Sequence, residues 1–152
     1  MRLPLLATIL ILSGCSVPQP AGNLENTPRN GVGIRTDRET FTPMMSSTVG
    51  IGLTPLYNPS GAYKPVEYQW RTNYGYFVAW GDEEEVRELG PDVRRDGKRI
   101  YWTYDPVDID QKKPPVEILL KIREVKTQQV LGEAALRLEW TDRDMAAVKQ
   151  PR

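Results

Sequence analysis

Apolar and polar residues alternate in short segments along most of this chain, and Pro, Gly, Asn and Asp separate the segments. The clearest segment is 66–72, where Val66, Tyr68 and Trp70 share one face. A period of two is typical of strands with one buried face. Thirteen Pro and twelve Gly also favour many turns over long helices. The same alternation predicts strands at 48–54, 99–104, 116–123 and 130–140; a further strand is expected at the aromatic segment 76–80, and 34–36 could form a short first strand.

Two parts of the chain are ambiguous. Residues 81–92 are acidic and irregular, and one helical turn could form over 83–89. Residues 131–138 contain Glu-Ala-Ala-Leu-Arg-Leu, which favours a helix by propensity. We predict a strand there instead, because the inward-facing residues keep a period of two through Trp140. Residues 141–152 are polar and are expected to form a frayed tail.

Six or seven short strands without a long helix predict an all-β fold. We expect a single Ig-like antiparallel β-sandwich of about seven strands over residues 31–140, with a small β-barrel as the alternative. The pattern resembles bacterial immunoglobulin-like domains of the PKD type. The resemblance lies in the strand 48–53, the loop 58–61, the Tyr-x-Trp strand at Tyr68-Gln69-Trp70 and the closing hairpin 116–140.

The N-terminus has the order of a secretory signal. Arg2 supplies one positive charge, and residues 5–12 are apolar apart from Thr8. This run is shorter than the roughly 20 residues that a membrane-spanning helix needs. It ends in Leu12-Ser13-Gly14-Cys15, which resembles the lipobox of bacterial lipoproteins.

The lipobox resemblance implies a cellular location. In that family Leu12, Ser13 and Gly14 would be read by the signal peptidase, which would cleave before Cys15. The Cys15 thiol would carry a diacylglycerol, and each buried CH₂ stabilises membrane binding by roughly 0.8 kcal/mol. The protein is therefore expected on the extracytoplasmic face of the cell membrane or the outer membrane. The alternative is an ordinary secretory signal with a coincidental cysteine.

The segment after the cysteine has a different composition. Residues 16–30 are polar, contain Pro, Asn and Gly, and show no periodicity. Such a segment buries too little apolar surface to order itself, so we expect a flexible tether; an ordered arm is the alternative. The expected order is a signal peptide at 1–14, lipidated Cys15 and tether at 15–30, the sandwich at 31–140 and a tail at 141–152.

Composition excludes several classes of function. Lys plus Arg and Asp plus Glu each number 20, and loss of Arg2 with the signal leaves 19 basic against 20 acidic residues. This balance provides no basic field for nucleic acid. Histidine is absent, and acylation of Cys15, the only cysteine, would leave no free thiol; this excludes His bases, Cys nucleophiles, Cys/His zinc sites and disulfides. We predict no enzyme activity and no cofactor.

Aromatic residues are the main candidates for ligand contact. Four Trp and seven Tyr gather largely between residues 68 and 104, and such side chains are enriched at binding hot spots. Trp70 and Trp102 lie on inward phases and are predicted to be core residues. Tyr74, Tyr76 and Tyr101 are the predicted surface contacts for a sugar or a protein.

Two acidic segments could attract cations. Asp105, Asp108 and Asp110 are closely spaced, and carboxylates are Ca²⁺ ligands. Their spacing is not that of an EF-hand loop, and residues 82–85 form a similar acidic run. We interpret both as solvated surface and predict no metal site.

The expected function is a membrane-anchored, non-catalytic envelope lipoprotein. Its sandwich would contact another envelope protein or give structural support, and an exposed sheet edge would suit strand addition. The alternative is a carbohydrate-binding module that recognises wall or exogenous glycan. Exposed aliphatic side chains or an unprotected edge strand would favour the first, and a row of exposed aromatics the second. A third possibility, a hydrolase, predicts a deep cleft with facing carboxylates.

The lipid anchor is directly testable. Cys15→Ser should move the protein out of the membrane pellet, because a hydroxyl cannot form the thioether to diacylglycerol. Cell fractionation measures this, with Ser16→Ala as a control that keeps the cysteine. A Cys15→Ser chain that stays in the pellet at the mass of the cleaved protein would contradict lipidation.

Overall fold

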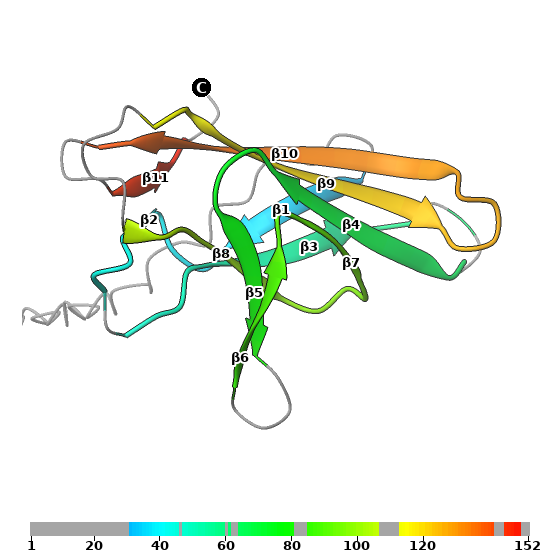
Figure 1. The fold of residues 1–152 in the computed structure, drawn as a ribbon. Coiled ribbons are helices and arrows are strands. Elements are labelled where there is room, and N and C mark those ends of the chain that lie inside the picture. Colours follow the sequence, from blue (N-terminus) through cyan, green and yellow to red (C-terminus); the bar gives the residue numbers. More distant parts are fainter. Residues whose placement is uncertain are drawn as a thin grey trace, which may run out of the picture.

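The computed structural model describes residues 31–45, 47–59, 61, 64–80, 85–106, 113–141 and 145–149. These residues form two antiparallel sheets packed face to face (Figure 1). The expected all-β antiparallel sandwich is therefore confirmed.

The first sheet has five strands, and their order in the sheet differs from their order in the sequence. From one edge to the other they are β1 (Val32–Thr36), β3 (Ile51–Tyr57), β8 (Ile100–Thr103), β5 (Tyr76–Trp80) and β6 (Val86–Gly90). β1 and β6 are thus the two edges, and β8 lies at the centre.

The second sheet has six strands. From edge to edge they are β2 (Thr40–Phe41), β11 (Ala146–Val148), β10 (Val130–Trp140), β9 (Val116–Glu124), β4 (Val66–Thr72) and β7 (Asp92–Arg95). The long β9–β10 hairpin forms its centre and turns at residues 125–129, where Gln128 has a φ of 58°.

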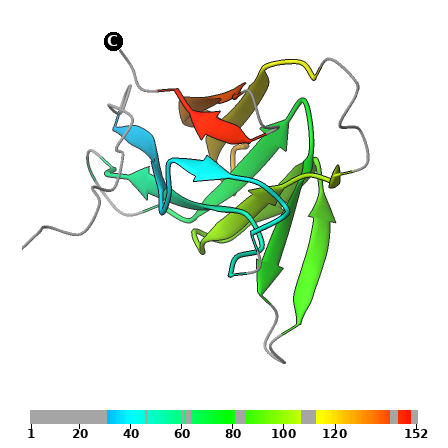
Figure 2. The same cartoon turned by 90° about the vertical axis from the view of Figure 1, so that its left-hand side faces the viewer.

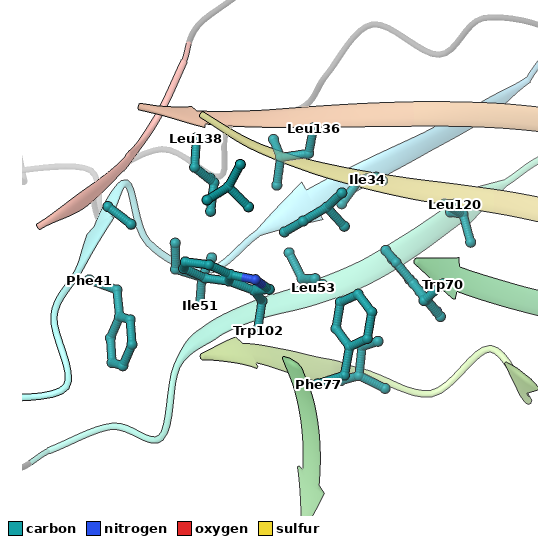
Figure 3. Packing of buried hydrophobic residues seen from close by; sticks show 14 of the residues in the cluster. Ile34, Phe41, Ile51, Leu53, Trp70, Phe77, Trp102, Leu120, Leu136 and Leu138 are labelled. Atoms are coloured by element: carbon teal, nitrogen blue, oxygen red, sulfur yellow. The ribbon is translucent and has the colours of Figure 1, made fainter. Parts of the chain in front are cut away.

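The core forms where the inward rows of the two sheets meet (Figure 3). Trp70 of β4 and Trp102 of β8 are both fully buried, as the strand phase predicts. On β9 the buried residues alternate without a break with partly exposed ones, which places Leu119 on the outer face. Burial of each large aliphatic side chain contributes about 1.5–3 kcal/mol, and this is the main source of stability in a chain without disulfides.

Several predicted strands agree closely with the structure. β4 and β5 have the predicted bounds, and β10 is a strand although its sequence favours a helix by propensity. The strand expected at 48–54 lies further along, at Ile51–Tyr57.

Other segments differ from expectation. No helical turn forms in the described part of 83–89, because Val86–Gly90 is β6 and pairs with β5. Within the expected tail, Ala146–Val148 forms β11, held by pairing with β10 and β2 and by the fully buried Ala146. These short strands raise the number to eleven from the expected seven or so.

The hairpin of β5 and β6 extends beyond the rest of the sandwich (Figures 1 and 2). It starts at a tight turn from β4, where Gly75 has a φ of 71°. A Cβ at Gly75 would overlap the Thr103 carbonyl oxygen and lie 2.9 Å from Nε1 of Trp102. The hairpin is therefore placed by a turn that only glycine fits.

Alanine substitutions at two glycines separate backbone strain from crowding. Gly90 also has a positive φ, 81°, but a Cβ there would meet nothing within 4 Å. Gly90→Ala should lower the free energy of unfolding by about 1–2 kcal/mol through strain alone. Gly75→Ala should lose about 1–3 kcal/mol more, because crowding adds to the strain. Urea denaturation measures both, and equal losses would contradict the turn geometry.

Candidate functional site

β6 is an edge strand with one unpaired side. Its other side pairs with β5 in the register Val78↔Glu88, Ala79↔Arg87 and Trp80↔Val86. Beyond β6, the described part of the chain contributes no further strand to the first sheet. Val86, Arg87 and Glu88 are all exposed. Backbone N–H and C=O groups along such an edge are a template for another strand.

The other sheet edges are less accessible to an additional strand. β1 is buried along most of its length and lies against β10 of the second sheet. β2 has two residues. β7 has four residues and carries ion pairs to its neighbour β4, with Arg71 Nε 2.9 Å from Asp92 Oδ2 and Arg94 3.5 Å from Glu67. β6 is thus the longest edge whose residues face solvent, among the described strands.

The edge at β6 carries two exposed apolar side chains. Trp80 is 52 % exposed and Val86 is 45 % exposed, and the two residues are opposite each other in the β5–β6 ladder. Both belong to the face opposite to the fully buried Phe77, which is the outer face of the sheet; Val78 lies on the same face and is only 4 % exposed. Isolated exposed apolar residues are common; here the two are neighbours beside an unpaired backbone. We call Trp80 and the exposed residues Val86, Arg87 and Glu88 the β6 edge.

Two of the three predicted contact tyrosines lie on this same outer face. Tyr76 is two positions from Val78 on β5, and Tyr101 of β8 is directly opposite Val78. Both are partly buried. The Tyr76 hydroxyl donates a hydrogen bond to Oδ1 of Asp105, 3.0 Å away. The outer face of the first sheet therefore brings Tyr76, Tyr101 and Trp80 onto one surface.

Tyr74 lies apart from them, in an aromatic cluster at the end of the sandwich. Its ring is 5.5 Å from that of Trp140 and 6.4 Å from that of Tyr104, measured between centroids. Trp102 donates its indole N–H to the Tyr74 carbonyl at 2.8 Å, and the Lys113 ammonium lies 4.8 Å from the Trp140 ring centroid. Tyr74 thus packs against the core and closes the end of the sandwich, and the three tyrosines form no single row.

Carboxylates surround the Tyr76 hydroxyl. Burial raises the pKa of Tyr76 to about 12, with further contributions from the hydrogen bond to Asp105 and from the charges of Asp105 and Glu88. Tyr76 therefore remains a neutral hydrogen-bond donor at neutral pH.

Several predicted positions lie outside the described residues. They are Leu12, Ser13, Gly14, Cys15, Asp108, Asp110 and residues 82–84. Within the described ranges, no three His, Cys, Asp or Glu side chains are grouped to hold a metal ion. The same ranges contain no helix long and apolar enough to cross a membrane.

Trp80 and Val86 are not among the ligand-contact residues that the sequence predicts. The segment Tyr76–Trp80 is apolar or aromatic at every position, so no alternation in the sequence marks Trp80 as exposed. Val86 is not marked either, since it follows an acidic run that is typical of solvated surface.

The pKa of Tyr76 gives a measurable prediction. Its raised folded-state pKa means that the associated stability is complete below pH 10 and is lost as pH rises toward 12. Asp105→Asn should lower the pKa of Tyr76 from about 12, because it removes the nearest negative charge. Ultraviolet titration of phenolate formation checks this, with Tyr76→Phe identifying the Tyr76 signal. An unchanged titration in Asp105→Asn would contradict the contact.

Comparison with protein-family models, with curated proteins and with solved structures finds no match.

Proposed function

We propose that this chain is a lipid-anchored envelope protein whose sandwich contacts another protein through the β6 edge. The observation that carries the proposal is the pair Trp80 and Val86, exposed together beside an unpaired strand. Apolar side chains next to unpaired backbone are disfavoured on a surface that contacts only water. A bound partner would cover both.

The attachment point of the chain supports the same arrangement. The lipobox resemblance at Leu12 to Cys15 supports an anchor at the N-terminal end, and β1 is the first of the described strands after it. β1 and β6 are opposite edges of the first sheet. Four inter-strand spacings, about 19 Å, separate them. The sandwich would thus present β6 on the side away from its own anchor strand.

The proposed role is non-catalytic. The chain contains no histidine, and lipidation would consume its only thiol. Its exposed carboxylates form ion pairs along the second sheet, such as Glu117 with Arg137 at 3.4 Å and Glu133 with Lys121 at 2.8 Å. Pairs of this kind are typical of a solvated sheet face.

A second candidate is glycan binding on the outer face of the first sheet. Tyr76, Tyr101 and Trp80 share that face, and aromatic rings stack on sugars. Two observations favour the protein contact instead: the Tyr76 hydroxyl is bonded to Asp105, and Tyr74 packs into the core end.

Crosslinking in intact cells tests the proposal with a matched pair of variants. Val86→Ser and Val125→Ser remove the same apolar groups from residues of similar exposure, 45 % and 48 %. Val125 lies in the β9–β10 turn, outside the β6 edge. Val86→Ser should reduce capture of the partner about tenfold, as loss of a central interface side chain does. Val125→Ser should leave it unchanged.

Two outcomes would contradict the protein-contact proposal. One is equal capture by both variants and the unchanged protein. The other is copurification of wall glycan in place of protein, lost in Tyr101→Ala, which would establish the glycan alternative.

A further inference from the structure

The β5–β6 hairpin has a charge that the rest of the chain lacks. From Tyr76 to Gly90 the sequence contains five carboxylates, at positions 82–85 and 88, and one cation, Arg87, giving a net charge of −4. The whole chain has 20 acidic and 20 basic residues. Glu88 and Arg87 are exposed and form no ion pair with another described residue. The charge of Glu88 is thus available to a partner.

Symmetry makes β6 a poor partner for a second copy of itself. Two antiparallel copies related by a two-fold axis must meet at a pair of identical residues, because opposed side chains share a face of the sheet. The register that pairs all five residues of Val86–Gly90 centres on Glu88 and places two Glu88 side chains opposite each other. The registers shifted by one residue centre on Arg87 or on Leu89; each pairs only three residues of the strand, and the first places two Arg87 side chains opposite each other. Like charges directly opposite destabilise a strand pair.

A different protein avoids this repulsion. Resting on the proposed function, we infer that β6 accepts an extended, basic segment of another protein as an additional antiparallel strand of the first sheet. Every strand pair in both sheets is antiparallel, so the addition continues the existing pattern. Main-chain hydrogen bonds would supply the affinity, and side chains the selectivity.

The register specifies the chemistry of that segment. Glu88 and Val86 are on the outer face, and Arg87 lies between them on the other face. In an antiparallel partner, the residue opposite Glu88 comes first and the residue opposite Val86 follows two positions later. The partner segment is therefore basic-x-apolar, with Lys or Arg paired to Glu88 and an aliphatic side chain against Val86 and Trp80.

A defined peptide tests this inference. The acetylated peptide Thr-Val-Thr-Lys-Thr-Val-Thr has the basic-x-apolar pattern, and replacing its Lys by Glu gives the charge-reversed control. The probe is added to the isotope-labelled full chain in detergent micelles, and backbone amide shifts are followed. The Lys peptide should shift the amides of β6 and bind at least tenfold more tightly than the Glu peptide. N-methylation of alternate peptide residues should abolish binding.

A charge swap on the protein completes the test. Glu88→Lys should reverse the preference between the two peptides. Glu39→Lys is the matched control, an exposed carboxylate that forms no ion pair with another described residue, and it should preserve the preference. Equal binding of the peptides, no binding of the Lys peptide, or binding that tolerates N-methylation would each overturn strand addition.

Two further results separate this inference from the proposed function. Sedimentation should find the unchanged protein monomeric, and a dimer whose β6 amides are protected would overturn the need for a different partner. If Val86→Ser loses its partner in cells while Glu88→Lys keeps the peptide preference of the unchanged protein, strand addition fails and the proposed function stands.

Discussion

Aromatic contacts between the two sheets hold the base of the β5–β6 hairpin in place. Trp70 of the second sheet meets Phe77 of the first at 6.3 Å between ring centroids. Trp102 and Trp140 make a similar contact at 6.5 Å. Phe77 is fully buried, and Trp80, three residues later on the same strand, is 52 % exposed. The exposed edge therefore depends on the most deeply buried residues of the sandwich.

Strands in which apolar and polar residues alternate over many positions are the parts of the fold that the sequence predicts best. On β9 the buried face follows from the alternation in the sequence alone, whereas on β4 Gln69 of the polar face is buried beside Trp70, and on β5 three consecutive residues are buried. β2 and β11 are too short to show a period, and only their pairing with each other and with β10 defines them. β6 was missed because its Glu-rich approach favours solvated structure by composition, whereas the ladder with β5 imposes the strand.

The candidate site was harder to predict than the fold. Trp70 and Trp102, which the strand phase predicts to point inward, are core residues, and the predicted surface residues Tyr76 and Tyr101 are partly buried on the outer face. Tyr74 lies in a turn, where strand alternation does not determine which way a side chain points. Its ring packs against Trp140. Whether a sheet edge is accessible to a partner also depends on strands that are distant from it in the sequence. β1 is an edge by topology and yet is covered by β10, which no local pattern in β1 reveals.

The opposite positions of β1 and β6 have a mechanical consequence. If the chain is held to a membrane before β1 and to a partner at β6, tension enters the first sheet at one edge and leaves it at the other. Each of the ladders β1–β3, β3–β8, β8–β5 and β5–β6 would then bear the load in series. The weakest ladder would set the force at which the link yields, so the two three-residue ladders that flank β8, with β3 on one side and β5 on the other, would determine the tensile strength of the whole connection.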